Sequence, residues 1–156
     1  MKNKHNVSTV EIAVVIPCYK VSAHILGVIQ AIGSEVNTIF VVDDCCPEKS
    51  GALVENSCAD SRVRVIYHPV NQGVGGAVMS GYKAAIADGA DVIVKVDGDG
   101  QMDPGLIPAF VAPIMAGEAD YTKGNRFFDL EEIRAMPKVR LFGNAVLSFM
   151  TKLSSG

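Results

Sequence analysis

Two aspartates separated by one glycine are the residues of this chain best suited to chemistry. Asp97 and Asp99 follow the apolar run Val92–Val96, and the glycines at 98 and 100 let the backbone turn so that both carboxylates can reach one cation. Gln101 adds a neutral oxygen. Because magnesium usually takes one or two carboxylates together with substrate phosphates, the motif predicts a Mg²⁺ or Mn²⁺ site that receives a phosphorylated ligand.

Other functions of the same motif have to be weighed against a metal site. An EF-hand loop would need Gly at the sixth position and Glu at the twelfth, where Met102 and Pro108 stand, so it is excluded. A dehalogenase-type phosphatase has Asp-x-Asp-Gly-Thr after its first strand, and residues 97–101 approach that pattern with Gln101 in place of Thr. That phosphatase and a plain solvated turn stay open as alternatives.

A glycine-rich segment at residues 71–76 follows an apolar run and opens a helical stretch. Its amides, that of Gly73 included, can meet a phosphate at the positive end of the helix. The full dinucleotide fingerprint is not met, because Val78 occupies the last glycine position. A nicotinamide-binding domain stays open, since Asp97 lies at about the distance of the ribose-binding acid. So do glycines that only allow the helix to pack closely.

Polar residues also follow the first two apolar runs. Asp43 and Asp44 can accept hydrogen bonds from a ribose hydroxyl or a base N–H, and Tyr19 can lie along the face of a base. Each group alone is equally compatible with a surface turn. Because ligands of an open parallel sheet bind beyond the carboxyl ends of the strands, we expect these residues to line a nucleotide site, together with Pro17 and Cys18.

The elements that must position these residues alternate along the chain in the βαβ manner. Near-continuous Val and Ile runs indicate strands buried on both faces, which is typical of a parallel sheet covered by helices on both sides. The predicted strands are Ile12–Ile16, Thr38–Val42, Val63–Tyr67 and Val92–Val96. The predicted helices between them are His24–Ile32, Gly51–Ser57 and Val74–Ala87. The fold class is therefore α/β with a mostly parallel sheet.

The C-terminal third continues the pattern less regularly. We expect a helix from Pro104 to about Met115 with Asp103 as its N-cap, and then a short strand at Asp120–Lys123. Apolar residues at helical spacing predict an amphipathic helix over Leu141–Leu153. With no internal repeat and no linker, one domain over residues 1–156 is expected.

Composition narrows the function further. The chain has 156 residues, is 49% apolar and 20% charged, and carries a formal charge of −3 with no Trp, so nucleic acid is not an expected partner. No apolar run approaches the roughly 18 residues of a membrane span, and the four cysteines lack zinc-ligand spacing. We expect a cytoplasmic protein with reduced thiols. Residues 121–156 carry six Lys and Arg against three Asp and Glu, a basic end on an acidic body.

Taken together, these motifs resemble those of family 2 glycosyltransferases. The matching segments are, in order, residues 14–19 (VVIPCY), 41–44 (VVDD), 71–77 (NQGVGGA), 97–104 (DGDGQMDP) and 124–126 (GNR). The chain is most similar to the branch that contains dolichyl-phosphate mannose synthase and other polyprenyl-phosphate glycosyltransferases. The resemblance covers residues 11–145 and implies a GT-A fold, a nucleotide-sugar-binding α/β domain.

The resemblance also implies roles for residues. It implies that Pro17, Tyr19, Asp43 and Asp44 surround the nucleoside and that Asp97, Asp99 and Gln101 hold the metal. Arg126 matches an arginine that faces the phosphates, and Arg140 matches a basic residue near the acceptor phosphate. Lys20 departs from the family, which usually has Asn there, and the missing Trp excludes the Gln-x-x-Arg-Trp motif of processive synthases.

The expected reaction is inverting transfer of a hexose from a UDP- or GDP-linked sugar, with Asp97, Asp99 and Arg126 as catalytic residues. Polyprenyl phosphate is the expected acceptor, because its charged oxygen needs no general base and the sequence has no obvious His or Glu beside the metal motif. We expect the chain to be truncated at its C-terminal end, with the full-length protein working at the cytoplasmic face of the membrane. A non-catalytic nucleotide-sugar-binding module is the remaining alternative.

Overall fold

A computed structural model describes residues 10–124, and all the helices and strands given below lie in the unit Met1–Thr122. The strands are β1 (Ile12–Cys18), β2 (Thr38–Asp43), β3 (Val63–Tyr67) and β4 (Val92–Lys95). The α-helices are α1 (Ile25–Gln30), α2 (Ser50–Ser57), α3 (Gly73–Ala87) and α4 (Ile107–Met115), and a 3₁₀ turn at Pro104–Leu106 precedes α4. The predicted alternation of strands and helices is confirmed.

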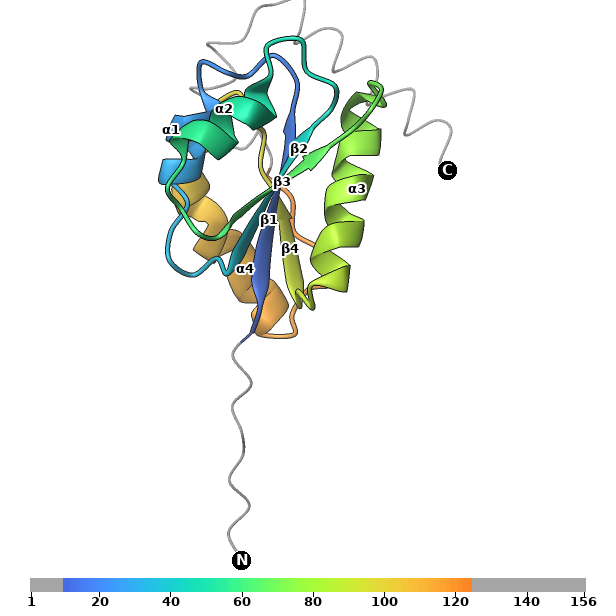
Figure 1. Cartoon of the computed structure of the whole chain (residues 1–156). Coiled ribbons are helices and arrows are strands. Elements are labelled where there is room, and N and C mark those ends of the chain that lie inside the picture. The colour runs from blue at the N-terminus through green and yellow to red at the C-terminus, as the bar shows by residue number, and fades with distance from the viewer. Residues whose placement is uncertain (1–9, 125–156) are drawn as a thin grey trace, which may run out of the picture. The chain divides into compact units, whose positions relative to one another are not determined.

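The four strands form one parallel sheet in the order β3-β2-β1-β4. The chain first builds outward from β1 through β2 to β3, and then crosses back to place β4 on the other side of β1 (Figure 1). The order therefore reverses between β1 and β4, and ligands of such sheets bind in the crevice that this reversal opens at the carboxyl ends of the strands.

Helices cover both faces of the sheet, as the GT-A prediction requires. Alternate residues of β1 point to opposite faces, which divides the apolar core in two. Val14 and Ile16 pack with α1, α2 and α4 on one face, whereas Ala13 and Val15 pack with α3 on the other (Figure 1). Every residue of β1 is buried.

Pro17 does not end the first strand, contrary to the sequence prediction. Strand β1 continues to Cys18, and Pro17 stays in register with Val42 of β2. The carbonyls of Val15 and Cys18 bond to opposite neighbours, which places the missing N–H of Pro17 on the side of β4. Pairing with β4 ends at Val15, so the proline removes no hydrogen bond from the ladder.

The prediction of a short strand at Asp120–Lys123 is wrong. Asp120 lies in a bend, and residues 121–123 have no regular secondary structure and no strand pairing. The hydroxyl of Thr122 donates to the carbonyl of Phe110 at 2.9 Å, so this part of the segment is attached to α4 rather than to a sheet edge. The N-cap prediction is confirmed, since the Asp103 carboxylate accepts from the Gly105 N–H at 2.9 Å. The predicted helix Leu141–Leu153 lies outside the described residues.

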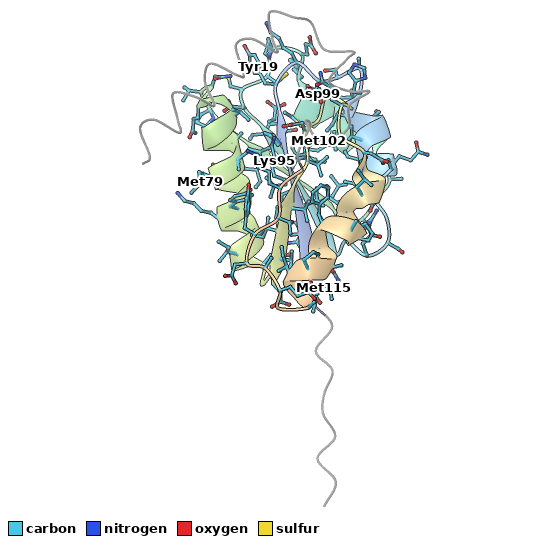
Figure 2. The ribbon with its side chains drawn as sticks, turned by 180° about the vertical axis from the view of Figure 1, so that it is seen from behind. Tyr19, Met79, Lys95, Asp99, Met102 and Met115 are labelled. Atoms are coloured by element: carbon cyan, nitrogen blue, oxygen red, sulfur yellow. The ribbon has the colours of Figure 1, made fainter. Side chains whose placement is uncertain are left out.

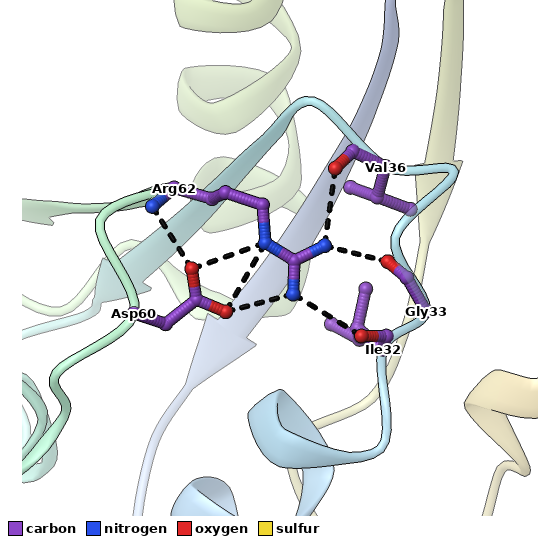
Figure 3. Close-up of polar contacts among 5 residues, drawn as sticks. All are labelled: Ile32, Gly33, Val36, Asp60 and Arg62. Carbon is purple, nitrogen blue, oxygen red and sulfur yellow. Dashed lines mark hydrogen bonds and ion pairs between the residues drawn. The ribbon is translucent and has the colours of Figure 1, made fainter.

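One arginine stabilises the amino-terminal end of the sheet, opposite the ligand crevice at the carboxyl ends of the strands. The guanidinium of Arg62 forms an ion pair with Asp60 at 2.7 Å and donates to three backbone carbonyls (Figure 3). Those carbonyls belong to Ile32, Gly33 and Val36, in the connection between α1 and β2. Arg62 therefore holds the start of β3 against the chain that leads into β2.

Candidate functional site

A cavity of about 370 Å³ opens at the carboxyl ends of the strands, where the strand order reverses. Residues that follow β1, β2 and β4 contribute to its wall, and the start of α3 completes it. The lining residues are Pro17, Cys18, Tyr19, Val21, Asp44, Asn71, Gly73, Val74, Ala77, Asp97, Gly98 and Asp99. The structure thus brings together most of the site residues expected from the sequence. Tyr19 and Asp99 lie at one end of the sheet and Met115 at the other (Figure 2).

The two aspartates of the proposed metal motif lie in this wall. The ammonium of Lys95 forms an ion pair with Asp97 Oδ1, so one cation already lies against this carboxylate. Asp99 Oδ1 accepts from the Gln101 backbone N–H at 3.0 Å, which fixes the turn. The exposed Gln101 is not part of the cavity wall. Among residues 10–124 no group of three His, Cys, Asp or Glu could hold a metal by itself.

Asp43 and Asp44 differ in what their carboxylates contact. Asp43 accepts from the backbone N–H groups of Cys46 and Gly51, both at 2.7 Å, so its two oxygens fix the loop into α2. Asp43 is buried and absent from the cavity wall. Asp44 belongs to the wall and accepts at Oδ1 from Gln72 N–H at 2.8 Å. Of the adjacent pair, Asp44 is the residue placed to meet a ligand.

The same Asp44 oxygen lies 2.7 Å from Nδ1 of His68. Burial opposes ionisation of Asp44, but hydrogen bonds from Gln72 N–H and His68 outweigh it, so the pKa of Asp44 lies below its ordinary value. Asp44 is therefore a buried but ionised acceptor in the cavity wall.

The residues after β1 give the cavity an aromatic side. Tyr19 is half exposed, and the ammonium of Lys20 lies 5.4 Å from the centre of its ring. Lys20 has a φ of +57°, the left-handed conformation that Asn adopts more readily, and its N–H contacts Cys46 Sγ at 3.1 Å. The buried Cys18 thiol contacts the Ile16 carbonyl, and burial raises its pKa to about 12, with contributions from Asp43 and Cys46.

The glycine-rich segment enters α3 at the edge of the cavity. Gly73 has a φ of +74°, and its N–H donates to Oδ1 of the Asn71 side chain at 3.0 Å. The amide of Asn71 donates to the Asp44 carbonyl at 3.1 Å. The segment is thus bound to the end of β2. Gly73, which the sequence led us to expect there, lies in the cavity wall together with Val74.

Sequence reasoning missed three residues around the site. His68 supports Asp44, Lys95 pairs with Asp97, and the exposed His24 lies beside Gly100, whose added Cβ would be 3.8 Å from His24 Nδ1. The turn of residues 97–101 therefore does have a histidine beside it, contrary to the sequence interpretation. Only the tertiary fold reveals the contacts of His68 and His24, because they join segments far apart in the chain. Lys95 lies two residues before Asp97, so the sequence itself carries the signal for that pair.

The family model for glycosyl transferase family 2 matches residues 13–155, nearly the whole chain. The chain belongs to glycosyl transferase family 2. This membership excludes two alternatives left open by the sequence, a dehalogenase-type phosphatase and a nicotinamide-binding domain. The structure agrees, since the aspartate motif follows the fourth strand rather than the first.

Related proteins of this family include polyprenyl-phosphate sugar transferases. The chain is 31% identical to the UDP-N-acetylglucosamine–dolichyl-phosphate N-acetylglucosaminyltransferase of Methanococcus voltae, over 93% of this chain and 63% of that protein. It is 32% identical to an uncharacterized protein of Methanocaldococcus jannaschii, over 94% of this chain and 59% of that protein. The undecaprenyl-phosphate mannosyltransferase of Micrococcus luteus is 32% identical over 56% of this chain and 36% of that protein. The chain thus spans about three fifths of the length of the first two relatives.

Solved structures confirm the fold. Residues 1–349 of S. aureus TarS, in complex with UDP, superimpose with a TM-score of 0.60 at 18% identity, covering 76% of this chain and 40% of that one. Within residues 10–124, no helix has the length and apolar character needed to cross a membrane. Arg126 and Arg140, the two arginines expected to act on phosphates, lie outside the described residues.

Proposed function

We propose that this chain is the donor-binding part of an inverting glycosyltransferase that moves a hexose from a UDP- or GDP-linked sugar to polyprenyl phosphate. The observation that carries the proposal is the cavity at the strand reversal, whose wall combines Asp44, Tyr19 and the pair Asp97 and Asp99. An aromatic ring and a fixed acceptor suit a nucleoside, and paired carboxylates suit a cation bound to its diphosphate.

The donor set in the wall fits Mg²⁺ or Mn²⁺. Asp97 and Asp99 supply two hard oxygen ligands. Gln101 is two residues further along the chain and would supply a third oxygen if its side chain turned toward the cation. Fewer than three acidic or imidazole ligands gather there in the described part of the chain, which suits a metal whose remaining positions are filled by phosphate and water. The Lys95 ammonium against Asp97 supports the attraction of this position for positive charge. When bound, the metal would stabilise the negative charge of the departing nucleoside diphosphate.

The chain's own residues would then divide the work. Tyr19 and Asp44 hold the nucleoside, while Asp97 and Asp99 orient the diphosphate end of the donor. We propose that Arg126 faces the phosphates and that Arg140 holds the acceptor phosphate. A phosphate oxygen is already charged at neutral pH, so its attack on the anomeric carbon needs no base from the protein. The acceptor's lipid chain would place the reaction at a membrane surface, and the names of the relatives support this acceptor class.

Calorimetry tests the donor half of the proposal. The chain is titrated with UDP, GDP, UDP-linked sugars and GDP-linked sugars, each in the presence of Mn²⁺ or of EDTA. We expect metal-dependent binding that Asp99→Asn weakens about tenfold or more. Asp103→Asn removes the same charge four residues away, outside the cavity wall, and should leave affinity unchanged. Affinity that responds neither to EDTA nor to Asp99→Asn rejects the metal site.

The acceptor half is tested with the protein expressed in membranes. We expect it to label polyprenyl phosphate, and Arg140→Ala to lower this transfer while nucleotide affinity stays unchanged. Efficient transfer to a free sugar hydroxyl, without a lipid-phosphate product, would reject polyprenyl phosphate as acceptor. Nucleotide-sugar binding without transfer to any acceptor would instead identify a non-catalytic module.

A further inference from the structure

A continuous chain of polar side chains runs from the cavity wall into the protein through His68. Nδ1 of His68 lies 2.7 Å from Asp44 Oδ1, and its Nε2 lies 2.8 Å from the hydroxyl of Ser80. The side chains of His68 and Asp44 are only 6% and 3% exposed. The three residues come from the end of β2, the end of β3 and the third turn of α3, so the contacts connect three separate elements.

The direction of these hydrogen bonds follows from the acceptor. An ionised carboxylate can only accept, so Nδ1 of His68 carries the hydrogen and donates it to Asp44. In the neutral ring Nε2 then has no hydrogen, and the Ser80 hydroxyl donates to it. The ring is also fixed through its own backbone, whose N–H donates to the carbonyl of Asp43 at 2.9 Å. The neutral His68 ring therefore has one orientation and one tautomer.

The consequence for Asp44 is a fixed carboxylate. Oδ1 accepts from both His68 and Gln72 N–H, while the backbone carbonyl of Asp44 accepts from Asn71. Two donors on one oxygen oppose rotation of the carboxylate about its Cβ–Cγ bond and leave Oδ2 to serve a ligand. The same donors also favour the charged form, which burial alone would disfavour.

We infer that His68 and Ser80 are positioning residues for the donor nucleoside. They hold the Asp44 carboxylate oriented so that Oδ2 accepts a hydrogen bond from a ribose hydroxyl or a base N–H. This inference rests on the proposed function, because it takes the cavity as the nucleotide site. In this series of hydrogen bonds, the Asp44 carboxylate and not the Ser80 hydroxyl faces the cavity, since Asp44 belongs to the cavity wall and Ser80 does not. The trio is thus not arranged with its serine as a nucleophile.

Two substitutions of His68 separate its two nitrogens. The side-chain amide of Asn reaches about as far as Nδ1, so His68→Asn keeps a donor for Asp44, whereas the longer Gln places its amide near Nε2. By calorimetry with UMP, UDP, GMP and GDP, we expect His68→Gln to weaken binding of the preferred nucleotide about tenfold. His68→Asn should stay within about threefold of the unaltered chain, and Ser80→Ala should lose about threefold. Met79→Ala, an exposed position on the same helix, is the control (Figure 2).

The pattern across ligands separates positioning from general weakening of the fold. A nucleoside contact predicts the same fold-loss for monophosphate and diphosphate, in protein that thermal unfolding shows to be folded at the titration temperature. Loss confined to diphosphates, or equal loss in His68→Asn and His68→Gln, would overturn the inference. A side-chain ¹⁵N spectrum of the neutral imidazole supplies a test without ligand, since protonation of Nε2 in place of Nδ1 would also overturn it.

Asp44→Asn distinguishes failure of the positioning role of His68 from failure of the nucleotide site itself. If Asp44→Asn weakens nucleotide binding while His68→Gln leaves it unchanged, the positioning role is refuted and the proposed function stands. If the unaltered chain binds neither UDP nor GDP, or Asp44→Asn has no effect, the nucleotide site itself is misplaced and both fail.

Discussion

Replacement of Arg62 by alanine should cost far more stability than replacement of its neighbour in β3, Arg64. The guanidinium of Arg62 pairs with Asp60 and donates to the carbonyls of Ile32, Gly33 and Val36 at 3.1, 2.5 and 3.1 Å (Figure 3). Loss of the side chain removes all these donors at once. Two of the three carbonyls belong to buried residues, which water reaches poorly.

The magnitude follows from the number and environment of these bonds. A hydrogen bond from a charged donor contributes about 1.5–3 kcal/mol, but an ion pair at a surface contributes only about 0–1 kcal/mol. Both partners of the Arg62–Asp60 pair are 25% exposed, so we count little for the pair and most for the carbonyls. We expect Arg62→Ala to lower the free energy of unfolding by about 3 kcal/mol and the unfolding midpoint by roughly 10 °C.

Arg64 is the matched control. It also pairs with an aspartate, Asp88, but its side chain is 57% exposed and makes no bond to a carbonyl. Arg64→Ala should cost about 1 kcal/mol or less, whereas Arg62→Lys, which keeps the charge without the fork of donors, should fall between the two. Urea unfolding followed by circular dichroism measures all three. Equal costs for Arg62→Ala and Arg64→Ala would refute the reasoning that the carbonyl contacts dominate.

Three further predictions concern packing, acid and thiols. An added Cβ on Gly81 would lie 2.2 Å from Val15 Cγ1, so Gly81→Ala should destabilise the fold by about 1–3 kcal/mol. Gly75 lies on the same helix, but an added Cβ there would meet no atom within 4 Å, so Gly75→Ala should stabilise the fold by about 0.5–1 kcal/mol. Urea unfolding that ranks the two variants in the opposite order would contradict this packing. Hydrogen bonds from Arg62 lower the pKa of Asp60, so this carboxylate stabilises the fold above about pH 4 and ceases to do so as the pH falls through its lowered pKa. Asp60→Asn should therefore flatten the acid limb of stability against pH, and an unchanged limb would count against the pair. Iodoacetamide at pH 8 should label the exposed Cys45 in native protein and leave Cys18 unlabelled, because Cys18 is buried with a pKa of about 12. Mass spectrometry of peptides measures the labelling, and faster labelling of Cys18 than of Cys45 would contradict the prediction.

The strands were predictable because a parallel sheet covered on both faces favours near-continuous apolar runs, which are a strong local pattern. Three of the four predicted strands still differ at an end. Pro17 illustrates why. Strand β1 can contain this proline only because pairing with β4 ends at Val15, before Pro17, and Lys95, the partner of Val15, lies almost eighty residues later in the chain. No window of sequence around Pro17 contains that information.

The site was predictable as a group of strand ends but not in the roles of individual residues. Asp43 and Asp44 look alike in sequence, yet neighbouring residues at a strand end point to opposite faces. Asp43 bonds to the N–H of Gly51 in α2 on one face, and Asp44 bonds to Gln72 beside α3 on the other. Only the order of the helices around the sheet decides which of the two aspartates meets the cavity.

The same topology explains why α3 is rich in glycine. Since β4 pairs with β1, the connection from β3 must cross two strands, and α3 therefore packs against both β1 and β2. Gly81 lets the helix approach Val15 of the central strand, and Gly73, with a positive φ, starts the helix at the cavity. The close approach also brings Ser80 within reach of His68, which would not be possible if a bulkier residue at 81 raised the helix from the sheet. Gly81→Ala is therefore expected to weaken nucleotide binding as well as the fold, whereas Gly75→Ala changes neither adversely.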